Sequence, residues 1–353
     1  EETAQTAPDA EGTLHFENLS ARMKTGYYTV MSLEENIAAI ECIDYDKMYE
    51  DLRDGLNQIA EAQWMMLQIP GAGETYTYKS LQDQYDTLRK TFDDIKDGKL
   101  QQDNADLVRQ LRDAENQLLM AGQTLYINLL GLEDQSAALT RQTAALDRTI
   151  EEVKLRYELG QVSAMTLQQT EAGKAQVESG KAAIDAAVAQ LRRQLNAMIG
   201  EELTAPLTLN ALPGVTAEQL AAMDVEKDLE KAKAASYDLY AAKLTLEDAD
   251  EEYKDKAGDL GYNKDNYEYI AVKHRWQAAQ YTYNAAVQNF ELSFRSLYDS
   301  VQSYASALNA AKVSLECERS DLAAAQLRYE QGTISENALH TAEDELYTAQ
   351  DTV

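Results

Sequence analysis

The chain has 353 residues, of which 61 are acidic and 32 are basic, and its formal net charge is −29. A field of this sign repels phosphate and excludes the usual nucleic-acid binders, which present a basic face. Only 4 prolines and 16 glycines occur, so the composition favours a few very long helices over two or three ordinary globular domains.

The first residues are acidic and show no apolar periodicity, so we expect residues 1–13 to form a disordered lead-in. The chain begins at Glu1 rather than at Met, which leaves open whether a signal peptide or lipid anchor precedes it. No apolar run approaches the roughly 20 residues that a membrane-spanning helix requires, so we expect no direct membrane span.

Breaking residues divide the rest of the chain into predicted helices. Pro70-Gly71 ends the first helix, Gly160 and Gly200 end two long ones, and a break is expected near Gly98. The predicted helices lie near residues 16–67, 75–101, 102–159, 164–199, 216–256, 267–331 and from 336 onward.

Apolar residues in these segments follow a seven-residue repeat. Such a repeat is typical of a coiled-coil seam rather than of a broad globular face. The two clearest seams are Leu129, Leu132, Leu139, Leu146, Ile150, Val153 and Tyr157, and Val301, Tyr304, Leu308, Ala311, Leu315, Leu322, Ala325 and Tyr329.

The chain also contains an internal duplication. The segment RYELGQVS, which begins at Arg156, returns as RYEQGTIS at Arg328, an offset of 172 (328 − 156). The offset holds without gaps through the flanking residues. We therefore expect two tandem repeats, 14–212 and 213–353. The last helix of the second repeat is expected to be truncated at Val353, relative to the first repeat.

In each copy a glycine lies between two heptad helices and is followed by a serine. Glycine tolerates positive φ at a helix end, and a serine oxygen can accept from the free amides of the next helix, so each copy predicts a tight turn between antiparallel helices. One copy fits a plain connector equally well, but two copies that share outward-facing Arg, Tyr and Glu favour a docking tip. The candidate site residues are Arg156, Tyr157, Gly160, Val162, Ser163, Arg328, Tyr329, Gly332, Ile334 and Ser335.

At these residues the chain resembles the TolC-type outer-membrane efflux family. Members carry two repeats, each with a helical hairpin whose turn has the pattern R-Y-x-x-G-x-x-S. The segment 191–200 is similar to the end of that family's first repeat, and 14–19 and 225–229 lie where each family repeat opens. The resemblance covers nearly the whole chain. It implies an all-α fold of long antiparallel coiled-coil hairpins that forms one protomer of an α-barrel.

The resemblance further implies a homotrimer around a conduit, with Gly160 and Gly332 at its periplasmic mouth. The turns would dock a membrane-fusion adaptor protein, which connects to an inner-membrane or ABC-type pump. The chain is then expected to be a non-enzymatic efflux or secretion component of the extracytoplasmic cell envelope, in the periplasm, at the outer membrane or at the cell surface. No cofactor is implied, and the transported molecule and the adaptor stay open.

The sequence departs from this family between the first and second helix of each repeat, where members insert membrane β-strands. In the second repeat the interval is only 256–266, too short for two strands of about ten residues. Before the interval, Tyr28 aligns with Tyr237 at an offset of 209 (237 − 28), so the first repeat holds an insertion of 37 residues (209 − 172). Helical periodicity near 52–95 predicts a helical hairpin there, and the protomer is expected to lack the β-barrel.

No catalytic constellation and no metal site is predicted. His15, His274 and His340 are dispersed, and sequence-adjacent glutamates point in different directions on a helix. Cys42 and Cys317 fall near opposite ends of the predicted hairpins, roughly 70 Å apart along the helix. Both cysteines should therefore be unpaired.

Two other functions stay open from the sequence. One is a structural coiled-coil envelope or surface protein that kept the fold and lost the conduit, which the oligomeric state would distinguish. The other is a ligand-binding helical bundle, which should show a pocket lined by aromatic residues such as Tyr267, Tyr269 and Trp276.

Overall fold

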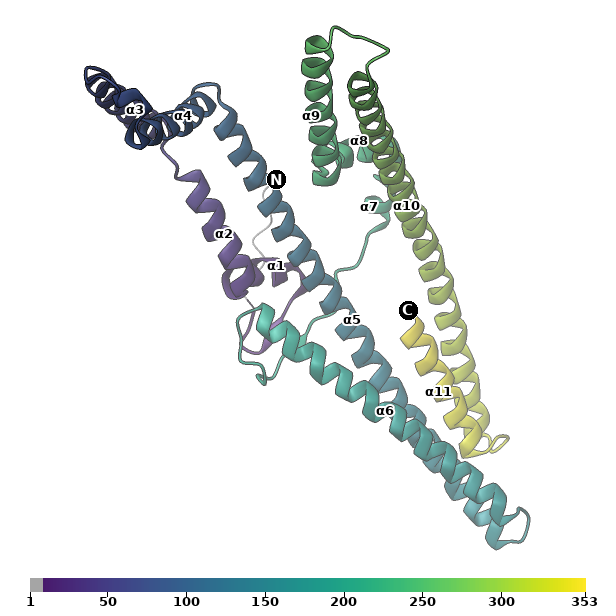
Figure 1. Ribbon diagram of the computed structural model, residues 1–353. Coiled ribbons are helices and arrows are strands. Elements are labelled where there is room, and N and C mark those ends of the chain that lie inside the picture. The colour runs from purple at the N-terminus through teal and green to yellow at the C-terminus, as the bar shows by residue number, and fades with distance from the viewer. Residues whose placement is uncertain (1–8) are drawn as a thin grey trace. The chain divides into compact units, whose positions relative to one another are not determined.

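The computed structural model describes residues 9–353, and nearly all regular structure in this range is helical (Figure 1). Two-residue strands and one 3₁₀ helix complete it. In chain order the elements are β1 (Thr13–Leu14), α1 (Phe16–Gly26), α2 (Tyr28–Glu41), α3 (Tyr45–Leu67), η1 (Ala72–Glu74), α4 (Tyr76–Lys96), α5 (Lys99–Glu158), α6 (Ala164–Met198), β2 (Thr208–Leu209), α7 (Ala217–Ala221), α8 (Val225–Ala235), α9 (Tyr237–Asp259), α10 (Tyr267–Glu330) and α11 (Glu336–Thr352).

The helix boundaries reproduce both sequence offsets. Helices α1 and α8 begin 209 residues apart (225 − 16), and so do α2 and α9 (237 − 28). Helices α5 and α10 end 172 residues apart (330 − 158), and α6 and α11 begin 172 apart (336 − 164). The duplication is therefore a duplication of structure, and α5 and α10 are the two long helices, of 60 and 64 residues.

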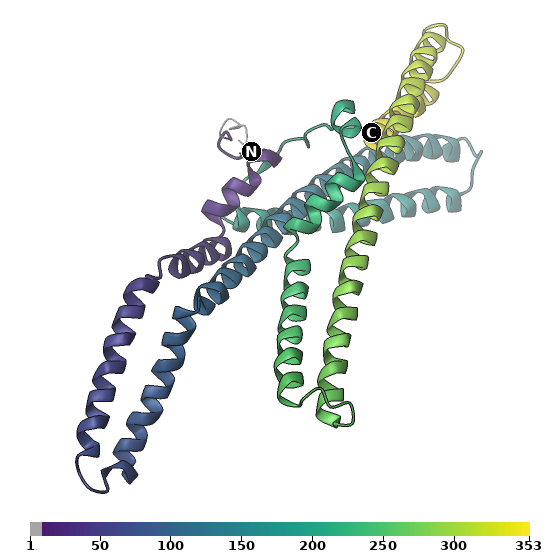
Figure 2. The same cartoon turned by 90° about the horizontal axis from the view of Figure 1, so that it is seen from above.

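The insertion in the first repeat is a helical hairpin, as predicted. Helices α3 and α4 run antiparallel and are joined through η1, while α9 and α10 are joined by a loop alone (Figure 2). Tyr49 of α3 stacks on Phe92 of α4 with ring centroids 4.5 Å apart. Gln63 donates to Gln82 across the hairpin at 3.1 Å. The expected break near Gly98 is also present, with Gly98 at φ +77°.

Two of the predicted helices are wrong as continuous elements. The segment 16–67 is interrupted at Tyr27, which has extended backbone, and again at Asp44, whose carboxylate accepts from the Lys47 amide at 3.0 Å. The segment 216–256 is interrupted at Asp224 and at Ser236, each of which caps the helix that follows. Capping side chains offer the backbone an alternative to helix continuation, and here they divide the segments.

The chain forms two compact units, which do not coincide with the two repeats. Within the described residues, one unit comprises 9–18, 124–196 and 202–353, and the other comprises 19–123 and 197–201. The first repeat is thus divided between them.

In the first of these units, β1 and β2 pair in parallel, with Leu14 opposite Leu209. The buried Tyr126 of α5 closes this pairing, because its hydroxyl lies 2.9 Å from the Leu14 carbonyl oxygen and 2.6 Å from that of Asn210. Burial raises the pKa of the Tyr126 phenol. Its repeat partner Tyr298, 172 residues later (298 − 126), donates to the Met223 carbonyl at 3.1 Å. Each repeat therefore anchors its entry segment through a tyrosine on its long helix.

The expectation of a disordered lead-in is wrong for residues 9–13, and residues 1–8 lie outside the described residues. Thr13 belongs to β1. Asp9 accepts from the Asn18 side chain at 2.8 Å and pairs with His15 at 2.6 Å. Burial opposes ionisation of Asp9, but the hydrogen bonds from Asn18 and His15 outweigh it, so the pKa of Asp9 is lowered.

The core of the other unit forms where α1 and α2 pack against α5. Its buried side chains include Leu19, Met23, Val30 and Ile37. Here Gly26 lies directly against the backbone of Ile199 and Gly200, too close for any side chain. None of the helices between residues 9 and 353 combines the length and the apolar character needed to cross a bilayer.

Candidate functional site

The first predicted turn joins α5 to α6 through a Schellman motif. The Gly160 amide donates to the Tyr157 carbonyl at 2.9 Å, and the Gln161 amide donates to the Arg156 carbonyl at 2.8 Å. Gly160 has φ +71°, a left-handed conformation that disfavours other residues. The backbone carbonyls of Arg156 and Tyr157 thus accept the hydrogen bonds that end α5. The side chains of these two residues take no part in the turn and face outward.

The second turn, between α10 and α11, has the same construction. The Gly332 amide donates to the Tyr329 carbonyl at 2.8 Å, and the Thr333 amide donates to the Arg328 carbonyl at 2.9 Å. Gly332 also has φ +71°. The Thr333 hydroxyl adds a bond to the Arg328 carbonyl at 2.8 Å.

The two serines cap the helices that leave the turns, as the sequence predicted. The Ser163 hydroxyl oxygen accepts from the Thr166 amide at 3.2 Å, and that of Ser335 accepts from the Ala338 amide at the same distance. Val162 and Ile334 are each half-buried between glycine and serine. Both turns are therefore fixed by hydrogen bonds at their two ends.

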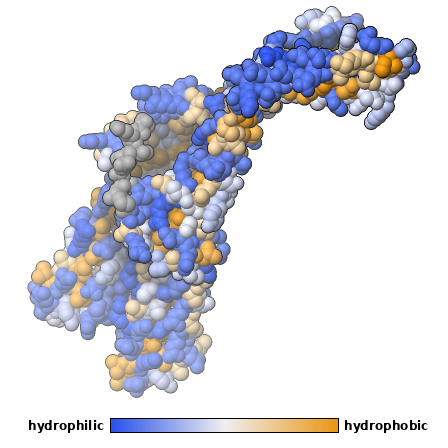
Figure 3. Space-filling model, turned by 90° about the vertical axis from the view of Figure 1, so that its left-hand side faces the viewer, coloured by the Kyte–Doolittle hydropathy of each residue, from blue (hydrophilic) through white to orange (hydrophobic). Residues whose placement is uncertain are grey.

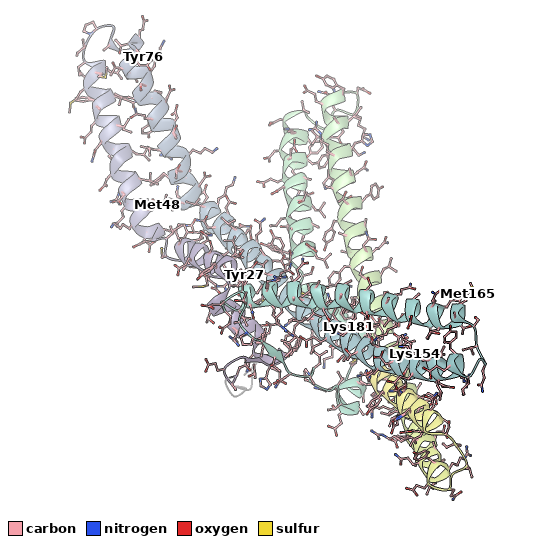
Figure 4. The ribbon with its side chains drawn as sticks, turned by 90° about the horizontal axis from the view of Figure 1, so that it is seen from below. Tyr27, Met48, Tyr76, Lys154, Met165 and Lys181 are labelled. Atoms are coloured by element: carbon pink, nitrogen blue, oxygen red, sulfur yellow. The ribbon has the colours of Figure 1, made fainter. Side chains whose placement is uncertain are left out.

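The turns expose apolar side chains that a solvated connector does not need. Tyr157 is 45% exposed and Tyr329 is 40% exposed. The leucines beside them, Leu159 and Leu327, are both about 60% exposed, at 63% and 60%. Met165, at the start of α6, is exposed beside the first turn (Figure 4). Each hairpin end thus carries a rim of Leu and Tyr.

The cationic side chains of the turns differ. Arg156 pairs with Glu152 one turn back along α5. Arg328 is exposed and has no ion-pair partner within residues 9–353. The second turn therefore offers a guanidinium to solvent where the first one holds its guanidinium on its own helix.

A ladder of polar contacts between α5 and α11 links the two hairpins near their turns. Arg148 donates to Asp344 at 2.5 Å, and Arg141 pairs with Asp351. The rungs are seven residues apart on both helices and run in opposite directions, as heptad packing requires. A third rung and a ring contact complete the ladder: Asn337 to Glu152 at 2.7 Å, and Arg141 over Tyr347 at 5.6 Å.

Sequence reasoning missed this ladder, although the signal is present. Arg141 and Arg148 are seven residues apart, and so are Asp344 and Asp351. These four charged residues lie beside the apolar seams and not within them. A search for regularly spaced apolar residues therefore does not find them.

The groove lined by Tyr267 includes neither of the other two aromatic residues expected for a ligand-binding bundle, Tyr269 and Trp276. Tyr267 lines a groove of about 450 Å³ together with Lys256 and Arg275. Tyr269 is buried, and Trp276 stacks on the ring of Tyr253 with centroids 4.9 Å apart. Two of the three aromatic residues therefore serve packing.

Both cysteines are unpaired, as predicted, and both are exposed. Cys42 caps the C-terminal end of α2 and its thiol lies 3.2 Å from the Ala39 carbonyl oxygen, while Cys317 lies on α10.

No family model matches the chain, and no curated protein matches it in sequence. Solved structures do match. The transmembrane channel protein CusC is 14% identical and superposes with a TM-score of 0.50 over 95% of this chain and 93% of CusC. The outer membrane protein VceC from Vibrio cholerae is 16% identical, with a TM-score of 0.46 over 72% of this chain and 69% of VceC. The outer-membrane channel OprN is 14% identical, with a TM-score of 0.43 over 95% and 85%.

The CusC superposition extends over both repeats. Together with the duplicated hairpins and their matched turns, it shows that this chain has a TolC-type, all-α fold.

Proposed function

We propose that the chain is a non-enzymatic efflux or secretion component of the cell envelope that docks a membrane-fusion adaptor at its two hairpin turns. The observation that carries the proposal is the matched pair of turns. Both have the same backbone hydrogen bonds, the same left-handed glycine and exposed Leu and Tyr side chains, although Leu159 and Leu327 occupy different positions of the repeat. A connector needs the glycine and the cap but gains nothing from an exposed apolar rim.

The α5–α11 ladder supports this proposal because it fixes the spacing of the two turns. An adaptor hairpin that inserted between them would meet Leu and Tyr side chains from both repeats. Arg328, which is unpaired within residues 9–353, would supply a cationic contact to an acidic side chain of the adaptor.

Docking can be tested with a photoreactive residue at Leu159 in the full-length protein, expressed in its own cells. The expected product is a covalent adduct whose partner is identified by mass spectrometry as a membrane-fusion adaptor. Leu203, a similarly exposed leucine away from the turns, is the matched control position. The same adducts from both positions, or none from Leu159, would remove the turns from the site.

We further propose that three copies assemble, as in the TolC-type resemblance, and the repeat predicts how they meet. Each ladder residue has a counterpart 172 positions away in the other repeat. Those counterparts are small or apolar: Val313, Ser320 and Ala324 on α10, and Ser179, Ala172 and Met165 on α6. The ladder geometry applied to them joins α10 of one copy to α6 of the next, a head-to-tail contact that can close a ring. Val313 and Met165 are each about two-thirds exposed in the single chain, at 67% and 66%.

Cysteine crosslinking tests this register. In a background where Cys42 and Cys317 are replaced by serine, Ser320→Cys with Ala172→Cys should give disulfide-linked species up to a trimer. Ser320→Cys with Ser179→Cys is the control, because it is displaced by one heptad, about 10 Å along the helix. Equal crosslinking of both pairs contradicts the register. A monomer by light scattering would instead favour a structural coiled-coil protein that lost the conduit.

A further inference from the structure

The far end of the inserted α3–α4 hairpin, residues 62–82, turns its large apolar side chains outward. Tyr76 is 87% exposed and lies at the end of the hairpin (Figure 4). Figure 3 shows apolar surface over the end of this arm, whose sides are mostly hydrophilic. The other outward-facing large side chains here are Trp64, Met65, Leu67 and Ile69, each more than half exposed.

This end is an ordered turn. Gly71 has φ +79°, η1 follows it, and the Thr75 hydroxyl accepts from the Tyr78 amide to start α4. The buried residue inside the turn is the small Ala72. The large apolar groups therefore face outward because of the fold and not because the turn is loose.

The backbone of the turn satisfies most of its own hydrogen-bonding groups. Pro70 has no N–H, and five neighbouring amides donate within the turn: Gln68 to Met65, Ile69 to Met66, Ala72 to Ile69, Glu74 to Gly71 and Thr75 to Ala72, at 2.9–3.3 Å. Backbone groups that enter an apolar phase must be paired internally, because no water is there to pair them. Most of the amides of this turn meet that condition.

The end of the α3–α4 hairpin is locally neutral, whereas the whole chain is strongly acidic. Between residues 62 and 82 the chain has one acidic residue, Glu74, and one basic residue, Lys79, while the whole chain has a net charge of −29. An acidic protein is repelled by an anionic surface, but this end is neutral. Its Trp and Tyr are the residue types that concentrate at membrane–water interfaces.

The α9–α10 loop, which occupies the same interval of the second repeat, has the same character. Tyr262, Tyr267 and Ile270 are exposed, and Tyr262 has the only positive φ of a non-glycine residue within 9–353, at 55°. Residues 254–275 hold five basic and four acidic residues. Two hairpin ends in corresponding positions therefore combine exposed aromatic side chains with local neutrality.

We propose that the end of the α3–α4 hairpin inserts into the headgroup region of a zwitterionic lipid bilayer. Met65 and Leu67 lie about 160° apart around the last turn of α3, so they do not form one face for a peptide or helix, whereas a fluid bilayer takes up such an end without a matching shape. Glu74 limits insertion to the interface, since a carboxylate is costly in the apolar interior. This membrane contact does not depend on adaptor docking at the glycine turns.

The chain supplies its own probe for a test. It has two tryptophans, and Trp276 packs on Tyr253, so Trp276→Phe leaves Trp64 as the single reporter. Phosphatidylcholine vesicles should move the Trp64 emission to shorter wavelength, and brominated lipids should quench it. Adding phosphatidylglycerol should weaken binding at low salt, because the remainder of the chain is strongly acidic.

Matched variants distinguish vesicle binding at this site from nonspecific adsorption of the protein to lipid. Met65→Ser with Ile69→Ser should weaken vesicle binding about tenfold per side chain, on the order of 100-fold together. Leu203→Ser with Val215→Ser is the control, since both residues are similarly exposed outside helices. Circular dichroism of both variants should match the parent because none of the four side chains is buried.

The outcomes are distinct. Loss of binding in the Met65/Ile69 variant alone supports the proposal. Absence of any Trp64 shift at saturating lipid, or equal binding by both variants, overturns it. A change of oligomeric state in the Met65/Ile69 variant without lipid also overturns it, because the end would then contact a second protein chain. Adaptor crosslinking at Leu159 is unaffected in each case, so this proposal and the docking proposal can fail separately.

Discussion

Among the glycines of residues 9–353, Gly26 is the one where an added Cβ would lie closest to backbone atoms of another segment, which predicts a large effect from one methyl group. A Cβ at Gly26 would lie 2.2 Å from the Ile199 carbonyl oxygen and 2.8 Å from the Gly200 amide nitrogen. Both atoms belong to the backbone at the end of α6, so they cannot rotate away. Gly26→Ala therefore requires α1 to move away from residues 199–200.

The expected cost follows from what has to move. Forcing extra atoms into a packed site costs about 1–3 kcal/mol when side chains can adjust. Here only the backbone can adjust, so we expect Gly26→Ala to reduce the free energy of unfolding by about 3 kcal/mol or more. Gly131→Ala is the matched control. It lies within α5 with no atom near its Cβ, and alanine should stabilise the helix by up to about 1 kcal/mol there.

Urea denaturation followed by circular dichroism measures both variants. With a slope of about 3 kcal/mol per molar urea, the Gly26→Ala midpoint should fall by about 1 M. A third variant, Gly122→Ala, should cost less, because its Cβ meets the flexible end of the Met23 side chain. A Gly26→Ala midpoint equal to that of Gly131→Ala would refute the reasoning and would mean that α1 moves freely against Gly200.

Three further predictions concern polar groups. Tyr126→Phe removes the hydroxyl that bonds the backbone carbonyls beside the β1–β2 pairing and should reduce the free energy of unfolding by about 1–3 kcal/mol. The effect should exceed that of Tyr298→Phe, and thermal unfolding compares the two variants. Folding lowers the pKa of Asp9, so its ionised carboxylate stabilises the folded state. This stabilisation is fully present above the pKa of the unfolded chain, about 4, and is lost as the pH falls through the lower pKa of the folded state. The stability difference between the parent and Asp9→Asn should therefore shrink in acid, and a difference independent of pH would contradict this. The Arg148 and Asp344 pair is partly exposed, so a double-mutant cycle should give a coupling below about 1 kcal/mol that decreases with salt.

The long helices and their turns could be predicted because their signals are local. Heptad spacing marks α5, α6 and α10, and the pair of glycine and serine marks each turn. The interruptions at Asp44, Asp224 and Ser236 also had a local signal, since each is a capping residue type, but it lay inside an apolar periodic pattern that favoured continuation. Tyr27 has no capping side chain and no local signal.

The break at Tyr27 could nevertheless have been found from the duplication. At the offset of 209, Tyr27 corresponds to Ser236 (236 − 209 = 27), and Ser236 has the capping signal that Tyr27 lacks. The β1–β2 pairing could not be found in this way. It joins two residues at 13–14 to two at 208–209, and so short a non-local contact depends on Tyr126 and not on strand propensity.

The charged residues of the ladder between α5 and α11 have uncharged counterparts in the other repeat. Within one chain, α5 meets α11 through arginine and aspartate, a contact whose register is fixed by opposite charges. If α10 and α6 carried the same charges, the two hairpins could exchange partners within or between chains at no cost. Small and apolar residues at Val313, Ser320 and Ala172 remove that ambiguity, because a charged face left against them would be unpaired. This divergence of the repeats is what the proposed head-to-tail assembly, with its two different contacts, requires.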